Sequence, residues 1–394
     1  MRCLALLATA LVACSAPPRS TLPTPAPAPV PARDLADAGA AAARGTGRAP
    51  ALATSDPRVV DLDIIRITAR APAPGADPEL TSIASADLFK QANEAAKSSR
   101  QRDAIAAYRQ LVAEFPESRF APVALFNIAA VHDSQGDLTA TIATLTELVA
   151  NYPTSRESID GHLYIAALQT DHHQWAIAAT TLAAVLARPG LAFSDRIEAF
   201  ARQGYVELEQ HRYDAADAAL SAAIAAWRAA PRIADPYYIA MAHYYRGELM
   251  HRRFLEAPVR SGDDDMVADL EAKRVLAGKA YDRWRDSLGF KQAYWATASG
   301  YQMSQIFVEL WEAHVKAPYP HRIDVATRPA YVVEVHARVR PDLEKALEGH
   351  RMNVELAKAY GITTPWSEAS AQQAVTIMEL LASDAAGRLT VPPD

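Results

Sequence analysis

Small and large side chains recur at a constant spacing between residues 85 and 231. A small residue is followed twelve positions later by a second small residue, and four positions further by a large apolar one, while the unit repeats after 37, 37 and 38 residues. Such spacings are typical of two consecutive helices that pack closely at the small residues, with the large one filling the remaining space. The four sets are Ala92, Ala104 and Tyr108; Ala129, Thr141 and Leu145; Ala166, Ala178 and Leu182; Gly204, Ala216 and Leu220.

Turn and helix-stop signals separate these units. The segment Gln135-Gly136-Asp137 predicts a turn between two helices, and units end in Phe115-Pro116, Tyr152-Pro153 and Ala230-Pro231, where Pro stops a helix. The pattern predicts an all-α chain with about four antiparallel helix pairs between residues 81 and 232.

This arrangement resembles the tetratricopeptide repeat (TPR), which has small residues at its eighth and twentieth positions and Pro near the end of a 34-residue unit. The units here are three or four residues longer, so we expect extended loops or helix ends. The resemblance implies a TPR-type helix-pair solenoid that binds other proteins. Another antiparallel helix-pair solenoid is the alternative, and it would change the functional expectation little.

Beyond residue 231 the repeats become irregular. Apolar periodicity predicts helices at 237–254, 266–287, 291–316, 330–360 and 367–386, with small residues Gly247, Ala298 and Gly300 at mid-helix. We expect residues 233–390 to form expanded helical pairs that cap the solenoid.

The first residues of the chain resemble an export signal. Arg2 precedes a short apolar stretch, and Leu11-Val12-Ala13-Cys14 resembles the lipobox of bacterial lipoproteins. The resemblance implies that residues 1–13 are a signal peptide and that Cys14 is lipidated; an ordinary secretory signal is the alternative. Ser15 after the cysteine favours, by analogy with Gram-negative lipoproteins, the periplasmic face of the outer membrane.

Residues 14–80 are rich in Pro and Ala, and we expect a disordered tether. Within it, Val59 to Thr68 is β-branched and partly alternating, which is strand chemistry. The segment is either a short apolar stretch of linker or a strand that pairs with a partner's sheet.

Composition argues against several functions. The net charge of −6 lacks the basic surplus of a nucleic-acid-binding protein, and after Cys3 leaves with the signal only Cys14 remains, so no disulfide is expected. No later segment reaches the roughly 18 apolar residues of a membrane helix. We find no phosphate-binding Gly loop and no hydrolase motif, and His172-His173 lacks a third metal ligand. The sequence therefore predicts no enzyme, no cofactor and no metal.

The expected binding surface is the concave face that TPR proteins form from the first helix of each pair. Its acidic and aromatic character would suit an extended or helical basic segment of an envelope protein, unless C-terminal helices fill the groove. We therefore expect a non-enzymatic scaffold in an envelope complex; a peptidoglycan-binding spacer or the targeting module of a cell-wall remodelling enzyme is the alternative. The resemblance implies as site residues Phe89, Asn93, Lys97, Phe126, Asp133, Asp160, Asp171, Glu198, Tyr205 and Glu209.

Overall fold

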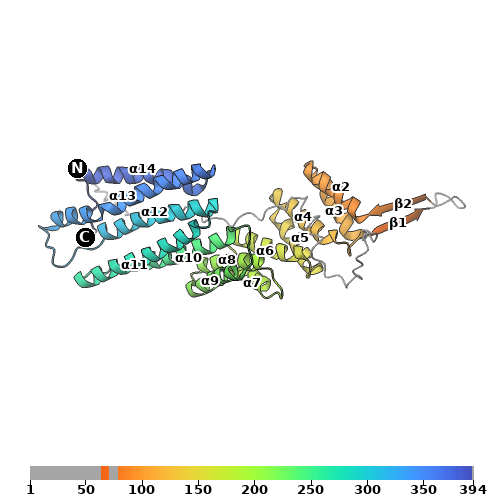
Figure 1. Ribbon diagram of the computed structural model, residues 1–394, viewed down its shortest axis with the longest axis horizontal. Helices are drawn as coiled ribbons and strands as arrows, with labels where there is room; N and C mark the ends of the chain where they lie inside the picture. The colour runs from red at the N-terminus through yellow and green to blue at the C-terminus, as the bar shows by residue number, and fades with distance from the viewer. Residues whose placement is uncertain (1–63, 71–78, 393–394) are drawn as a thin grey trace, which may run out of the picture.

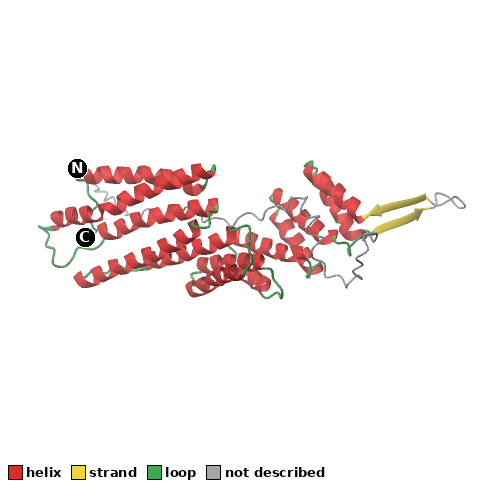
Figure 2. Cartoon of the chain, viewed as in Figure 1, coloured by secondary structure: helices red, strands yellow, loops and turns green. Residues whose placement is uncertain are grey.

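The computed structural model describes residues 64–70 and 79–392, and most of this part of the chain is helical (Figure 2). The helices follow one another along an elongated array, with a β-hairpin at one end (Figure 1). The strands are β1 (Ile65–Arg70) and β2 (Glu79–Ala84). The helices are α2 (Ser85–Lys97), α3 (Gln101–Glu114), α4 (Phe120–Ser134), α5 (Leu138–Asn151), α6 (Arg156–Asp171), α7 (Trp175–Leu186), α8 (Phe193–Glu209), α9 (Tyr213–Ala229), α10 (Tyr237–Glu256), α11 (Asp263–Leu288), α12 (Ala293–Val315), α13 (Arg328–Tyr360) and α14 (Pro365–Ala385).

The first eight helices form the four predicted pairs, α2/α3 to α8/α9, and each helix packs on its neighbours in the chain. The twelve residues of the repeated sets are all buried. At Gly204 of α8 the need for a small residue is direct, because a Cβ there would lie 2.4 Å from Leu220 Cγ of α9. The predicted helix-pair solenoid is confirmed.

The C-terminal helices repeat this arrangement on a larger scale. They form the pairs α10/α11 and α12/α13, followed by the single helix α14. A Cβ at Gly247 would lie 2.3 Å from Trp284 Nε1, and one at Gly300 would lie 2.3 Å from Asn353 Oδ1. A small residue on the first helix thus again receives a large residue from the second, which confirms the expanded helical pairs.

The hairpin corrects the expected end of the tether. β1 and β2 pair antiparallel, with Ile65 facing Ala84 and Arg70 facing Glu79, so regular structure begins before residue 80. From Ile65 onward, the β-branched segment Val59 to Thr68 thus pairs with a strand of the same chain. β2 leads directly into α2, which ties the hairpin to the first helix pair. The predicted signal peptide, Cys14 and the strand's first residues, Val59 to Asp63, lie outside the described residues.

Candidate protein-binding surface

The aromatic residues predicted for the concave face lie inside the solenoid. Phe89 of α2 stacks on Phe120 of α4 with ring centroids 4.8 Å apart. Phe126 of α4 lies 6.0 Å from the ring of Tyr164 of α6. Tyr205 of α8 is also buried. Each of these side chains packs toward the first helix of the following pair, and so they hold successive pairs together.

Tyr205 continues this contact into the C-terminal region. Its ring stacks on Tyr245 of α10 at 4.5 Å and meets the edge of Trp175 of α7 at 5.8 Å. The regular repeats and the expanded pairs therefore share one apolar core at this junction.

Two of the predicted polar residues are held by tyrosine hydroxyl groups. Asn93 accepts a hydrogen bond from Tyr108, whose hydroxyl accepts one from Asn127 Nδ2 at 3.1 Å. Burial raises the pKa of Tyr108 to about 12, so its hydroxyl remains a donor at neutral pH. Asp133 accepts a hydrogen bond from the Tyr164 hydroxyl at 2.6 Å. The Tyr108 hydroxyl thus joins α3 to α2 and α4, and the Tyr164 hydroxyl joins α6 to α4.

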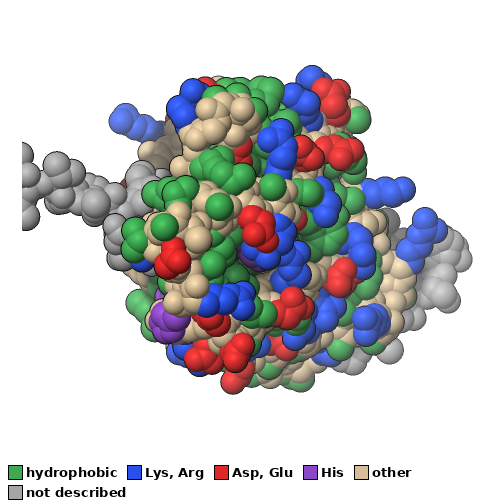
Figure 3. Space-filling view, turned by 90° about the vertical axis from the view of Figure 1, so that its left-hand side faces the viewer, with side chains coloured by type: hydrophobic (Ala, Val, Ile, Leu, Met, Phe, Trp, Pro, Cys, Tyr) green, Lys and Arg blue, Asp and Glu red, His purple; other side chains and the backbone are tan. Residues whose placement is uncertain are grey.

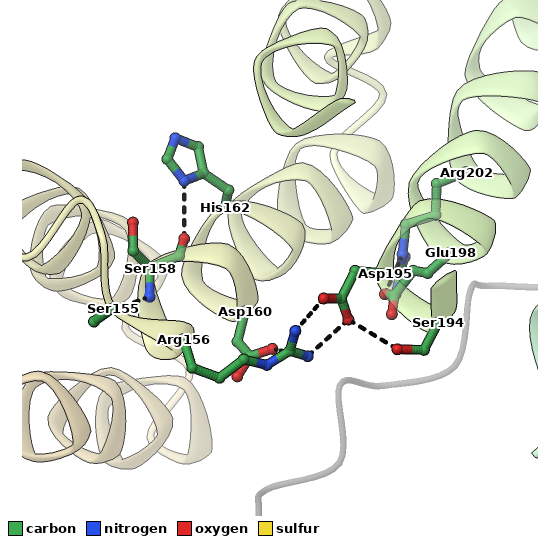
Figure 4. Close-up of polar contacts among 9 residues, drawn as sticks. All are labelled: Ser155, Arg156, Ser158, Asp160, His162, Ser194, Asp195, Glu198 and Arg202. Atoms are coloured by element: carbon green, nitrogen blue, oxygen red, sulfur yellow. Dashed lines mark hydrogen bonds and ion pairs between the residues drawn. The ribbon is translucent and has the colours of Figure 1, made fainter. Parts of the chain in front are cut away.

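Arginine residues neutralise several of the predicted carboxylates. Figure 4 shows Arg156 of α6 between Asp160, 2.9 Å away on the same helix, and Asp195 of α8, to which its guanidinium donates two hydrogen bonds. The Ser194 hydroxyl also donates to Asp195 at 3.3 Å. The bidentate contact between Arg156 and Asp195 fixes the spacing between the third and fourth pairs.

A second arginine contact joins α8 to α10. Arg202 is 2 % exposed, and its guanidinium bonds Glu198 at 2.8 Å and the Tyr238 hydroxyl at 2.8 Å. At the end of α8, Arg252 of α10 donates to the Glu209 carboxylate. Sequence analysis missed these arginines. The spacing of four residues in Arg156–Asp160 and Glu198–Arg202 was the available signal.

Three of the predicted residues remain exposed: Lys97, Asp133 and Asp171. They lie at the C-terminal ends of α2, α4 and α6, and Glu209 occupies the same place on α8, where it is half-buried. We call these four residues the inner row. Each of the four short pairs thus has one charged residue of the predicted groove at this place, although the carboxylate of Glu209 is already paired with Arg252.

An open groove of about 550 Å³ lies along α13. Its residues recur every three or four positions, so they share one face of the helix. Apolar Leu347, Met352 and Leu356 lie among three glutamates and one arginine. The lining is Glu344, Leu347, Glu348, Arg351, Met352, Glu355, Leu356 and Ala359.

The surface and the described side chains offer little for other chemistry. In the end view of Figure 3, Lys and Arg alternate with Asp and Glu, so this face presents no large area of one charge. Within 64–70 and 79–392, no group of three or more His, Cys, Asp and Glu side chains is placed to hold a metal ion. No helix in those ranges is long and apolar enough to cross a membrane. His173 lies in the turn after α6, at φ 56°.

Residues 88–118 and 123–155 match the tetratricopeptide repeat family, and the two stretches correspond to α2/α3 and α4/α5. The first two helix pairs of the chain are thus tetratricopeptide repeats. No curated protein matches this sequence.

Several solved structures resemble the chain, and two of them illustrate the likeness. One is the MamA RS-1 ArsTM double mutant, at 12% identity over 51% of this chain and 95% of that chain, with a TM-score of 0.35. The other is a tetratricopeptide repeat protein from Parabacteroides merdae ATCC 43184, at 11% identity over 75% of this chain and 98% of that chain, also with a TM-score of 0.35. Because both scores are low, the fold assignment rests on the helix pairs themselves.

Proposed function

We propose that this protein is a non-enzymatic scaffold that binds other proteins of the bacterial envelope. The observation that carries the proposal is the array of tetratricopeptide helix pairs, because such repeats stack into extended surfaces used for protein binding. Each short pair packs on the next one mainly through its second helix, which contacts the first helix of the following pair.

The partner that fits best is a segment with basic and apolar residues. Asp133 and Asp171 of the inner row are exposed at matching places on consecutive pairs, which suits lysines or arginines at a regular spacing. The α13 groove offers a second surface of the same character, with apolar residues between glutamates. An amphipathic basic helix would place its apolar side chains in this groove and its charges on the rim.

The location that we propose is the periplasmic face of the outer membrane. The support comes from the sequence, where Cys14 ends a lipobox-like motif and a Pro- and Ala-rich segment follows. Several acyl chains, at about 0.8 kcal/mol per buried CH₂, would anchor the protein durably. The segment after Cys14 would then hold the repeats away from the membrane.

The test compares two charge reversals in cells. Asp171→Lys alters the inner row, whereas Asp103→Lys makes the same change on α3, the second helix of the first pair, where Asp103 is exposed. After cross-linking and purification, mass spectrometry should show that Asp171→Lys loses a partner that Asp103→Lys retains. A third variant, Met352→Lys, asks the same question of the α13 groove.

Equal partner capture by wild type and all three variants would contradict the proposed surfaces. Circular dichroism checks that the variants keep their helices. Membrane fractionation of cells that express Cys14→Ser tests the anchor separately, because this variant should leave the membrane fraction.

A further inference from the structure

One face of the β1/β2 hairpin is fixed to the first helix pairs. The Arg66 guanidinium donates to the carbonyl oxygen of Glu114 at 2.9 Å, lies 3.5 Å from the Glu114 carboxylate and sits 5.6 Å from the centre of the Phe115 ring. Ile83, which faces Arg66 across the hairpin, packs against the same core. The even-numbered side chains of β1 therefore lie on the side of Arg66, which faces the helices.

The backbone of β1 leaves every second residue with its polar groups directed outward. Ser85 N donates to Ile64 O at 3.1 Å, so Ile64 and Ser85 form a hydrogen-bonded pair. Such pairs alternate along an antiparallel ladder, which makes Arg66 and Thr68 the next ones to bond β2. The N–H and C=O groups of Ile65, Ile67 and Ala69 consequently point away from β2. Among the described residues, no third strand meets this edge.

The side chains of these same residues are apolar and exposed. Ile65 is 50% exposed and Ile67 is 69% exposed. Natural proteins usually protect a sheet edge with Lys, Pro, a bulge or a covering loop. None of the three outward-directed residues is charged or Pro, and a lone two-stranded hairpin is marginally stable in water. The edge has the properties of a pairing surface.

We propose that β1 pairs antiparallel with β1 of a second copy of this chain, about a twofold axis at Ile67. The two hairpins would then form one four-stranded sheet, in the order β2, β1, β1, β2. Ile67 would face Ile67 of the partner subunit, and Ile65 would face Ala69 of the partner subunit. All three outward-directed residues would then exchange backbone hydrogen bonds across the axis.

The choice of a second copy rests on the self-complementarity of β1. In this register, Ile65, Ile67 and Ala69 of both copies share one face, which makes a continuous apolar strip. On the other face Arg66 faces Thr68 of the partner subunit, so no like charges are opposed among these pairs. A twofold contact uses the same patch twice, which is the commonest way in which soluble proteins associate. The hairpin projects beyond the helices at one end of the array, where a second hairpin can approach (Figure 1).

Cysteine cross-linking of the full-length protein tests the pairing. Residues in a hydrogen-bonded pair have Cα atoms about 5.5 Å apart, a separation that a disulfide can span. Under mild oxidation, Ile67→Cys should give a covalent dimer. Ile177→Cys places the thiol at a similarly exposed isoleucine, 55% accessible, on the distant helix α7 and should give none. The parent protein controls for Cys14.

A second variant keeps the hairpin and removes the pairing. Ile67→Lys sets two positive charges against each other on the axis, while its outward-directed backbone leaves the β1/β2 bonds unchanged. Sedimentation in detergent should show a dimer for wild type and Ile177→Lys, and a monomer for Ile67→Lys. Equal cross-linking at residues 67 and 177, or a dimer that survives Ile67→Lys, would overturn the proposal. A cross-link from residue 67 to a different protein would instead assign the edge to a heterologous strand.

Discussion

The four short helix pairs and the two long helix pairs pack their two helices together in the same way but with different side chains. In both, a small residue on the first helix lets the second helix approach, as at Gly204 with Leu220 and at Gly247 with Trp284. The second helices grow from 14 residues in α3 to 26 in α11 and 33 in α13. In the long pairs the side chains at these contacts are larger and the helices are longer. The regular repeat spacing of the short pairs is therefore absent from their sequence.

The two regions also differ in what they bury. The short pairs bury Ala, Leu and aromatic rings together with arginine–carboxylate contacts such as Arg202 with Glu198, but none of their buried residues is His. The long pairs add a polar network, in which Asn353 Nδ2 of α13 donates to Thr297 O of α12 at 2.9 Å and to Ser370 Oγ of α14 at 2.8 Å. Apolar contacts tolerate small shifts, whereas a buried polar group that loses its partner is costly. Because the buried histidines of the described residues, such as His251 and His350, all lie in the long pairs, these pairs should depend more strongly on pH.

The largest expected effect tests the short pairs. Leu145 of α5 is fully buried among the repeats, so Leu145→Ala should lower the free energy of unfolding by about 2–5 kcal/mol, from lost burial and the cavity left behind. Ile177→Ala, at an exposed isoleucine, should change it by no more than about 0.5 kcal/mol. Urea unfolding followed by circular dichroism measures both. Similar values for the two variants would show that the repeat register is wrong.

An intermediate effect compares two helical glycines. Gly204→Ala places a methyl group against Leu220, and overpacking of this kind costs about 1–3 kcal/mol. At Gly278 of α11 a methyl group would meet no atom within 4 Å, so Gly278→Ala should stabilise the helix by up to about 1 kcal/mol. Opposite signs in the same unfolding assay confirm that tight packing, and not helix propensity, selects glycine at 204. A stabilised Gly204→Ala would refute this.

Sequence periodicity was sufficient for the helices and for the short pairs, because the small and large residues that bring the two helices of a pair together lie within one repeat unit. It was insufficient where contacts span longer distances. Glu209 was predicted to be a groove residue, yet its carboxylate accepts a hydrogen bond from Arg252, which is 43 positions away. No repeat after residue 231 fixes the register of α10, so this pairing had no signal. The strand at Ile65 was detected from its β-branched residues, but its partner Glu79–Ala84 was assigned to the tether and the first repeat.

The smallest expected effect, about 1 kcal/mol, concerns His251 in the long pairs. Burial disfavours its imidazolium, but Glu309, 2.6 Å away, and Glu248 outweigh this and raise the pKa of His251 to about 10. Because the folded state binds this proton more tightly, His251 stabilises it fully at pH values below the ordinary pKa of 6.5. This contribution is lost as the pH rises toward 10. Between pH 7 and 8 the free energy of unfolding should thus fall by about 1 kcal/mol.

His350 of α13 should act in the opposite direction, and the two histidines can be separated. Burial lowers the pKa of His350 to about 4, so its contribution is present above pH 6.5 and is lost as pH falls toward 4. The loss of stability between pH 7 and 8 should disappear in His251→Gln, while the acid-side loss should remain. In His350→Gln the alkaline slope should remain, and the acid-side loss should become smaller without disappearing, because burial also lowers the pKa of His243 to about 4. If His251→Gln leaves the alkaline slope unchanged, His251 is not charged in the folded protein, and a charged buried histidine does not distinguish the long pairs from the short ones.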